Sequence, residues 1–314
     1  MRKLVVAAAQ MGPVGRDASR REVVQRMLEL MREAHGRGVR HLVFPELALT
    51  TFFPRDFHEC PEDIDRYFET AMPGPATRPL FELAAGLRMG FTLGYAEQCA
   101  DGRRFNSSAL VDESGKVVGT YRKVHLPGTS RYDPGRRWQQ LEKLYFLPGN
   151  LGFRVWRSQG VNIGMCLCND RRWPESFRVL GLQDAELVTI GYCTPALNTT
   201  APERESAQLR ESQSELTLRA GAYQNACFVV ASAKAGTEEG CEHMAGSLIV
   251  APTGEVLAKA RTADDEIVSA PIDLDECAFY KRGLFDFAAH RRPQAYRLIC
   301  ERTGAMPPDE AISS

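Results

Sequence analysis

Residues 164–175 read GMCLCNDRRWPE, and this stretch indicates where a buried strand gives way to a helix. The apolar run VNIGMCLC at 161–168 ends on Cys168 and predicts the strand. A polar cluster follows at once, after which Pro174 and Glu175 suit the first turn of a helix. A cysteine at such a corner lies near backbone N–H groups and the helix dipole, which favour the nucleophilic thiolate. Cys168 is therefore a candidate nucleophile, and the alternative is an inert core cysteine.

Two charged residues follow other apolar strands of the chain. Glu46 comes directly after the strand-like run RHLVF and Pro45, and partial desolvation there suits a general base. Lys123 follows the strand-like run GKVVGTY at 115–121, where a cation can stabilise an oxyanion. Taken singly, each also fits a bland role, Glu46 as a loop cap and Lys123 as a solvated strand end.

In this order, Glu46, Lys123 and Cys168 resemble the catalytic triad of the nitrilase superfamily of carbon–nitrogen hydrolases. The superfamily's cysteine segment, Cys-x-Asp-x-Arg-x-Pro-Glu, is filled in register by residues 168–175. Cys166 comes two residues early and is predicted to pack within the strand. The resemblance covers roughly residues 3–300 and implies a single-domain α/β fold, a four-layer α-β-β-α sandwich. We expect that domain over residues 1–300 and a poorly ordered tail over 301–314.

Further segments are similar to one branch of that superfamily, the N-carbamoyl-D-amino-acid amidohydrolases. The resemblance implies hydrolysis of a ureido acid to the D-amino acid, ammonia and carbon dioxide, without a cofactor. It also implies copies that pair through helices, as a homodimer or homotetramer. The segments are FPELALTTFFPR (44–55), RRFNSS (103–108), RKVHLPG (122–128), LEKLYFLPG (141–149), CNDRRWPE (168–175), SLIVAPTGE (247–255) and AHRRPQ (289–294).

The resemblance assigns catalytic roles to four side chains. Cys168 would be the nucleophile, and Glu46 the base that takes its proton and passes one to the departing nitrogen. Lys123 would stabilise the oxyanion together with the backbone N–H of Asn169. Glu142 matches a second glutamate that positions Lys123 and the substrate, the alternative being an exposed loop charge.

Arginines next to the cysteine bear on specificity. In the branch, the pair that corresponds to Arg171 and Arg172 holds the substrate carboxylate together with the neighbouring Asn169. A guanidinium fork matches a carboxylate in geometry. Arg172 also falls on an arginine common to the whole superfamily, so a structural role, pairing Asp170 or Glu175, remains an equal alternative.

Four more residues are expected near the substrate. His125 would be a further donor to the carboxylate, and Thr194 is retained from the branch. Two positions depart from it. Gln140 stands where a histidine is usual, and Cys193 stands where an asparagine is usual. Both changes put the preferred substrate in doubt without touching the chemistry.

The composition and net charge of the chain exclude several classes of protein. The 314 residues are 44% hydrophobic, enough for one sizeable core or two small ones. With 39 basic and 40 acidic residues, the chain lacks an electrostatic footprint for nucleic acid or an anionic membrane. No apolar run approaches the roughly 20 residues of a membrane span, and MRKLVVAAAQ suits a first strand better than a signal peptide. The nine cysteines, which show no paired spacing, favour a reducing cytoplasm. The six histidines form no ligand-spaced pair, so we expect no metal.

The alternation of strands and helices predicts a mixed, layered α/β domain. Long Pro- and Gly-rich loops at 46–76 and 123–150 are of the length that usually serves function. Helices are predicted at 20–37, 77–88, 175–183, 204–224 and 273–283. Strands are predicted at 3–10, 40–45, 90–97, 106–112, 115–122, 161–168, 186–190, 226–234, 245–251, 255–259 and 265–272.

Three functional interpretations remain. The first is an N-carbamoyl-D-amino-acid amidohydrolase. The second is a related enzyme for another ureido acid, such as N-carbamoyl-β-alanine, or for a linear amide. The third is a non-catalytic interaction protein with the same fold, which the intact triad disfavours.

Overall fold

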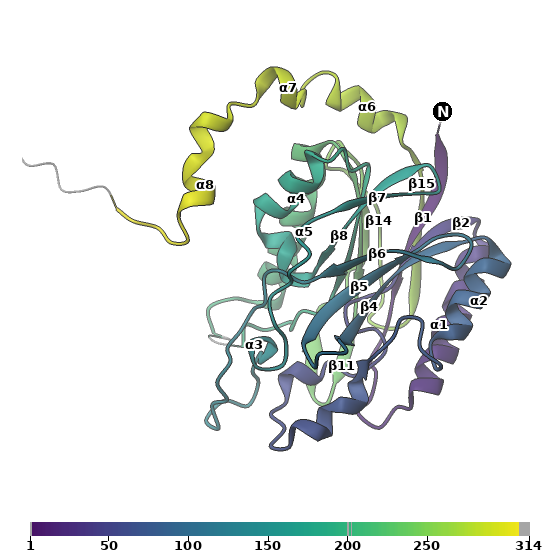
Figure 1. Ribbon diagram of the computed structural model, residues 1–314, viewed down its shortest axis with the longest axis vertical. Helices are drawn as coiled ribbons and strands as arrows, with labels where there is room; N and C mark the ends of the chain where they lie inside the picture. The colour runs from purple at the N-terminus through teal and green to yellow at the C-terminus, as the bar shows by residue number, and fades with distance from the viewer. Residues whose placement is uncertain (1, 200, 202, 308–314) are drawn as a thin grey trace, which may run out of the picture.

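The computed structural model describes residues 2–199, 201 and 203–307 of the chain. Within that part, two β-sheets lie face to face between layers of helices (Figure 1). The first sheet has seven strands, in the order β15 (Glu266–Asp273), β1 (Lys3–Gln10), β2 (Val39–Val43), β4 (Gly90–Gln98), β5 (Arg104–Val111) and β6 (Val117–Arg122), with β3 (Phe68–Glu69) beside β4. The second has six described strands, in the order β14 (Val256–Lys259), β13 (Leu248–Val250), β10 (Phe228–Ala233), β9 (Leu187–Tyr192), β8 (Val161–Leu167) and β7 (Val155–Ser158).

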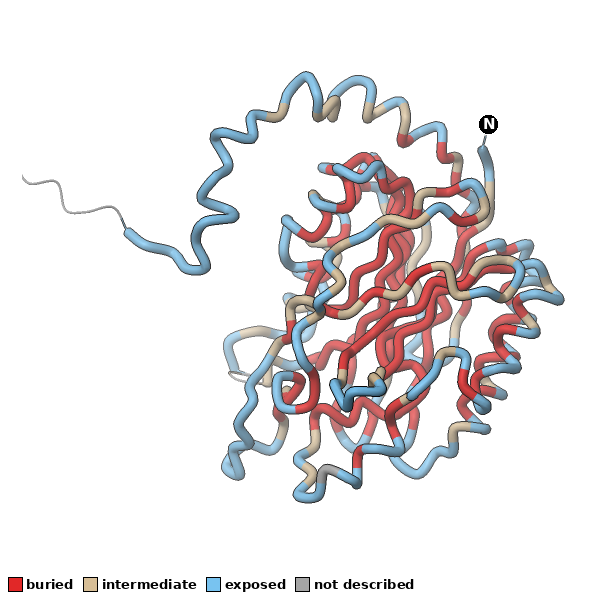
Figure 2. The backbone as a smooth tube through the Cα atoms, viewed as in Figure 1, coloured by how far each residue is buried: buried red, intermediate tan, exposed pale blue. Residues whose placement is uncertain are grey.

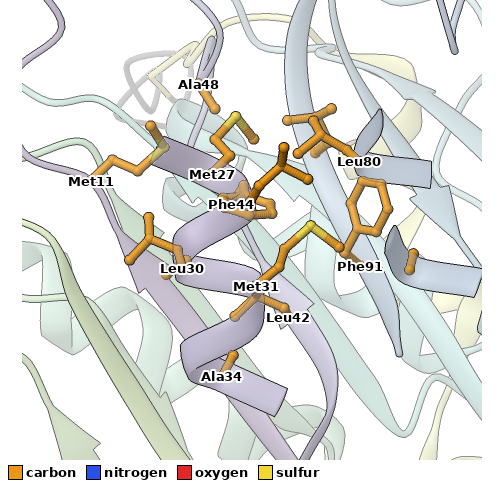
Figure 3. Close-up of a cluster of buried hydrophobic side chains, with 14 of the residues drawn as sticks. Met11, Met27, Leu30, Met31, Ala34, Leu42, Phe44, Ala48, Leu80 and Phe91 are labelled. Carbon is orange, nitrogen blue, oxygen red and sulfur yellow. The ribbon is translucent and has the colours of Figure 1, made fainter. Parts of the chain in front are cut away.

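Three apolar clusters separate the four layers. The strand period of two divides β1 between two of them: Ala7 and Ala9 face the helices, while Val6 and Ala8 face the second sheet. The first cluster packs α1 (Arg20–Gly36) and α2 (Arg78–Leu87) on the first sheet (Figure 3). The second fills the space between the sheets, and the third packs α4 (Pro174–Gly181) and α5 (Ala207–Asn225) on the second sheet. The predicted α-β-β-α sandwich is confirmed.

Local signals set the ends of the main helices. The Ser19 side chain accepts from the Glu22 backbone N–H, and Glu22 accepts in return from the Ser19 backbone N–H, so α1 begins with a capping box. Pro174 occupies the first turn of α4, as its fixed φ favours. All five predicted helices are present with ends shifted by a few residues.

Several short elements lie outside the predicted ones. The loop at 46–76 holds η1 (Phe53–Arg55), η2 (Pro61–Tyr67) and β3, and the loop at 123–150 holds the one-turn helix α3 (Glu142–Tyr145). The hairpin of β11 (Gly236–Glu238) and β12 (Cys241–His243) also departs from the predicted strands. Its two turn residues, Glu239 and Gly240, have φ of 48° and 79°, as a tight hairpin turn requires.

The chain ends in an arm of short helices that leads away from the body (Figure 1). The arm comprises α6 (Asp275–Lys281), α7 (Phe287–His290), η4 (Pro293–Tyr296) and α8 (Arg297–Glu301). Cys277 is buried in the cluster between the sheets, whereas the later part of the arm is largely exposed (Figure 2). Of the tail predicted at 301–314, residues 301–307 are exposed and 308–314 lie outside the described residues. Among the described helices, none is long and apolar enough to cross a membrane.

Candidate active site

Glu46 lies between the two sheets, in a position that only two glycines leave open. It follows β2 and is completely buried. A methyl group on Gly94 in β4 would lie 2.5 Å from the Pro45 carbonyl oxygen. A methyl group on Gly191 in β9 would lie 2.6 Å from the Glu46 nitrogen. Since neither contact is sterically possible, glycine on both sheets is what lets the segment pass between them.

Lys123 joins two buried carboxylates. Its Nζ donates to Glu46 Oε1 at 2.7 Å and to Glu142 Oε2 at 2.6 Å, and all three side chains are 0% exposed. The Asn106 side-chain amide donates to the same two oxygens, at 2.8 Å and 3.4 Å. The Asn106 carbonyl accepts from the Lys123 backbone N–H at 2.8 Å, which fixes the start of the lysine loop. Glu142 is therefore not the exposed loop charge of the alternative interpretation.

The charges in this cluster are set by burial and by each other. Burial alone would lower the pKa of Lys123, but the carboxylates of Glu142 and Glu46 outweigh it and hold that pKa above its ordinary value. Lys123 is therefore cationic, as an oxyanion stabiliser must be. Burial raises the pKa of Glu142 despite the opposing pull of Lys123. Glu142 Oε1 is buried and has no hydrogen-bond partner within the described residues.

Cys168 begins η3 (Cys168–Arg172), directly after β8, with φ at 42°. A non-glycine residue in the left-handed region is strained, and such strain clusters at functional sites. The Sγ atom lies 3.6 Å from the carbonyl oxygen of Cys193 and 3.6 Å from Thr194 Oγ1. Cys166, by contrast, is buried among Phe177, Leu180 and their neighbours, as predicted for a packing residue.

The protonation state of Cys168 differs from the sequence-based prediction. Burial and the Glu46 carboxylate raise the pKa of the thiol, against the opposing effect of Lys123 and Arg171. The resting residue is therefore a thiol and not a thiolate. The dipole of α4 does not lower the pKa of the thiol, because α4 begins only at Pro174 and the effect of burial is larger. A thiol nucleophile needs a base to remove its proton, which is the role predicted for Glu46.

Asp170 ties the cysteine segment to the lysine loop. Its fully buried carboxylate accepts from the Leu167 backbone N–H at 3.0 Å and from the Tyr121 hydroxyl at 2.7 Å. It also accepts from the backbone N–H and Nδ1 of His125, at 2.9 Å and 2.8 Å. The His125 ring is stacked on Trp173 and stays partly exposed. His125 is thus held beside η3, and its Nε2 is the nitrogen that remains for a ligand.

Arg171 is buried beside the nucleophile. Its Nη1 donates to the Cys168 carbonyl at 2.6 Å and lies 3.7 Å from Cys168 Sγ. Its Nη2 donates to Thr194 Oγ1 and Ser214 Oγ, both at 3.1 Å. The guanidinium also lies over the Tyr192 ring, 4.7 Å from its centre. Within the described residues, every hydrogen-bond partner of this buried cation is neutral.

The other predicted substrate contacts are distributed around this group. Arg172 is exposed and donates a hydrogen bond to the Asn169 side chain at 3.3 Å. Among the described residues it does not pair with Asp170 or Glu175. The Asn169 amide donates in turn to the His125 carbonyl at 3.1 Å.

Gln140 lies apart from this group, two residues before Glu142 in the chain. Its side chain is partly buried, and Oε1 has no partner within the described residues. It borders a surface cavity together with Trp138 and Lys143.

The main chain of Cys193 contacts both Glu46 and Cys168. Its backbone N–H donates to Glu46 Oε2 at 3.0 Å, and its carbonyl is the oxygen beside Cys168 Sγ. Its side chain points elsewhere, with Sγ 3.5 Å from His243 Nδ1. The side chain packs in an apolar cluster. Its place near the substrate stays a prediction.

The contacts of His243 define its tautomer. Arg55 donates to His243 Nε2, and because arginine cannot accept, that nitrogen carries no proton. The ring proton is therefore on Nδ1, and the Cys193 sulfur lies beside the ring, 3.5 Å from Nδ1 and 3.7 Å from Nε2. Burial, then Arg55 and Lys234, lower the pKa of His243 from 6.5 to about 2, so the ring stays neutral.

This chain of contacts predicts different effects for two substitutions of His243. Asparagine places its amide N–H donor at the Nδ1 position, whereas glutamine places its amide at the Nε2 position, where its oxygen accepts from Arg55. We expect His243→Asn to keep kcat near wild type and His243→Gln to lower it about tenfold at unchanged KM, the scale of one lost hydrogen bond. Steady-state kinetics on the two variants check this, and equal kcat values would contradict it.

The same histidine predicts a pH effect on stability. Because its folded-state pKa lies below its unfolded value of 6.5, the unfolded chain binds the extra proton first as pH falls. The contribution of neutral His243 is thus fully present above pH 6.5 and is lost progressively below it. Urea unfolding of wild type and His243→Asn between pH 5 and 7 should show the smaller pH slope in the variant. Parallel slopes would contradict it.

Several supporting residues were not assigned a role from the sequence. Asn106 lies within the quoted RRFNSS segment, so a signal existed without a function attached to it. Ser214, Tyr121 and His243 carried no signal, because their contacts join segments far apart in the chain. Among the described residues, no group of three or more His, Cys, Asp or Glu side chains could hold a metal ion.

Comparison with known proteins places this site in a family. The model of the carbon-nitrogen hydrolase family matches residues 5–282, and the chain therefore belongs to that family. The N-carbamoylputrescine amidase of Oryza sativa subsp. japonica is 28% identical over 313 residues, covering 96% of each chain. The citrullinase of Francisella tularensis subsp. tularensis is 28% identical over 281 residues, covering 86% of this chain and 90% of its own.

Solved structures agree on the fold. A carbon-nitrogen hydrolase from Helicobacter pylori G27 has a TM-score of 0.79 at 24% identity, covering 96% of this chain and 99% of its own. Saccharomyces cerevisiae Nit3, a member of branch 10 of the nitrilase superfamily, has a TM-score of 0.72 at 18% identity, covering 90% and 94%. The predicted superfamily is confirmed, and the D-amino-acid branch stays a prediction.

Proposed function

We propose that this carbon-nitrogen hydrolase acts on N-carbamoyl-D-amino acids and releases the D-amino acid, ammonia and carbon dioxide. The observation that carries the proposal is Arg171, a buried guanidinium 3.7 Å from the candidate nucleophile with only neutral partners in the described part of the chain. A buried cation without a counter-charge is costly unless a ligand supplies one. A substrate carboxylate that displaced the Thr194 and Ser214 hydroxyls as acceptor would do so in the bidentate geometry that arginine favours.

The chemistry begins with the neutral thiol. Glu46 takes the Cys168 proton as the sulfur attacks the ureido carbon, and a C–S bond forms while the carbonyl π bond opens to an oxyanion. Lys123 and the Asn169 backbone N–H stabilise that oxyanion. The C–N bond then breaks as the departing nitrogen takes the proton from Glu46.

Water completes the reaction. Glu46 removes a proton from the water that attacks the carbonyl of the thiocarbamate intermediate, and the C–S bond breaks with return of a proton to sulfur. The carbamate that results decomposes to ammonia or amine and carbon dioxide. The free Glu142 Oε1 is an acceptor suited to a ureido N–H, which supports its role in positioning the substrate.

Two relatives named above act, by their names, on other ureido compounds, N-carbamoylputrescine and citrulline. Putrescine derivatives end in an amine, which a site with Arg171 and Arg172 would repel. Hydrolysis rates should therefore be compared for D and L N-carbamoyl amino acids, N-carbamoyl-β-alanine, citrulline, N-carbamoylputrescine and a linear amide. Preference for the D ureido acids supports the proposal, and preference for N-carbamoylputrescine contradicts it.

Arg171→Lys tests the carboxylate contact. Lysine cannot supply two parallel N–H donors, so KM for an N-carbamoyl-D-amino acid should rise about tenfold or more. The effect should vanish for a ureido alkane that lacks the carboxylate. Ser214→Ala is the matched control, because it removes a support of Arg171 and keeps the guanidinium. An equal loss on both substrates would assign Arg171 a structural role.

We further propose a cytoplasmic homodimer or homotetramer. The exposed apolar residues Leu209, Leu216 and Tyr223 recur at seven-residue spacing on α5, which supports pairing through the outer helical layer. The nine cysteines are all free thiols, which favours a reducing compartment. Light scattering in solution tests the assembly, and the mass of a monomer would contradict it.

A further inference from the structure

A cavity of about 450 Å³ opens at the surface beside the β11–β12 hairpin. Three segments enclose it: the loop at 136–138, the segment at 195–199 and the turn of the β11–β12 hairpin. The volume lies in the range of about 300–1,000 Å³ typical of small-molecule sites. The catalytic residues already described do not line it.

The cavity is continuous in the chain with the residue that touches the nucleophile. Thr194 lies 3.6 Å from Cys168 Sγ, and the next residue, Pro195, is a wall of the cavity. This segment runs as an added strand along β12. The Thr194 carbonyl accepts from Met244 and the Ala196 N–H donates to Glu242, both at 2.8 Å. The residue that contacts the sulfur and the first residue of this cavity wall are therefore adjacent in the chain.

The cavity combines an apolar part with a polar rim. Trp138 is the largest apolar wall, and Pro195 and Cys241 are its buried apolar neighbours. The polar and charged lining residues are Arg136, Arg137, Asn198, Thr199 and Glu242. Gly240 has φ at 79° and a Cβ there would lie 3.5 Å from the Trp138 ring, so the hairpin turn packs on the indole edge. The Arg137 guanidinium lies 4.9 Å from the centre of the same ring. The flat face of the Trp138 ring is a surface on which another aromatic ring can stack.

We infer that this cavity receives the side chain of the substrate and selects ureido acids with an aromatic or large apolar side chain. The inference rests on the proposed function, since it assumes a carboxylate at Arg171 and a ureido carbon at Cys168. With those two groups fixed in the buried site, the side chain is the part of the substrate left to extend past Thr194. Trp138 is then a specificity-determining residue outside the catalytic cluster.

The test compares N-carbamoyl-D-phenylalanine with N-carbamoyl-D-alanine. Wild type should have the higher kcat/KM on the phenylalanine derivative. Trp138→Ala should lower the ratio of the two kcat/KM values about tenfold, the low end of what one apolar contact contributes to selectivity. Trp138→Phe should restore most of the ratio. Phe279→Ala, an exposed aromatic residue on the C-terminal arm, is the control and should leave the ratio as it is.

A second variant guards against misfolding of the loop. Leu197 is 52% exposed at the cavity wall, so Leu197→Asp should fold and lower the same ratio by placing a charge beside the ring. A ratio unchanged in both Trp138→Ala and Leu197→Asp overturns the inference while the proposed function stands. Failure of wild type to hydrolyse either compound removes the proposed function, and this inference with it.

Discussion

Replacing Cys168 with alanine is expected to abolish turnover while the protein stays folded. Cys168 is the only described cysteine that combines a strained left-handed backbone with contacts to Thr194 and to the peptide that holds Glu46. Without sulfur, no covalent intermediate can form, and water would have to attack the ureido carbon directly. Ammonia release measures the rate, and circular dichroism confirms the fold.

Cys166→Ala is the matched control two residues away. It deletes one buried sulfur from the packed cluster under α4, so we expect most activity to remain and about 1 kcal/mol of stability to be lost. An inactive Cys166→Ala together with an active Cys168→Ala would show that the motif has been placed in the wrong register.

Lys123→Ala is expected to lower kcat by about 10²–10³ or more, the scale for removal of an oxyanion stabiliser. The structure adds a complication, because removal of Nζ leaves the Glu46 and Glu142 carboxylates buried without their cation. The double variant Lys123→Ala with Glu142→Gln removes one of those charges and should fold better without regaining activity. A double variant with near wild-type kcat would show that Lys123 serves only to balance charge.

Glu46→Gln removes the base and keeps the shape. Because the pKa of the Cys168 thiol is raised, the variant has no group to take the proton, and kcat should fall on the same scale as in Lys123→Ala. Single-turnover kinetics should show that the loss is in the formation of the intermediate. A folded variant that forms the intermediate at the wild-type rate would remove Glu46 from the mechanism.

Much of the fold could be predicted because its main elements carry local signals. Continuous apolar strands such as β1 and capped helices such as α1 can be recognised over eight or more residues. Some strands of two to four residues, among them β3, β7, β11 and β12, cannot. Their pairing depends on a partner brought by the rest of the chain, so sequence patterns within them are too short to read.

The site, like the fold, could be predicted from the sequence only in part. The residues alone left Glu46, Lys123 and Cys168 each open to a bland interpretation, and only the resemblance suggested that they meet. The seat of Glu46 between Gly94 and Gly191 joins three strands from both sheets, which no local pattern encodes. The contacts of the Cys193 side chain could not be predicted, because position in a motif does not give the direction of a side chain at the end of a strand. Cys193 contributes its backbone N–H, which donates to Glu46 and which any residue except proline would supply.

The central claim is that Cys168 carries a covalent intermediate during hydrolysis of a ureido acid. Rapid-quench mass spectrometry of the protein mixed with an N-carbamoyl-D-amino acid tests it most directly. We predict one adduct on the peptide that contains Cys168. Its mass would be that of a carbamoyl group if the amino acid leaves first, or of the substrate less ammonia if ammonia leaves first. Turnover of the substrate with no adduct on Cys168, or with an adduct on another residue, would contradict the account.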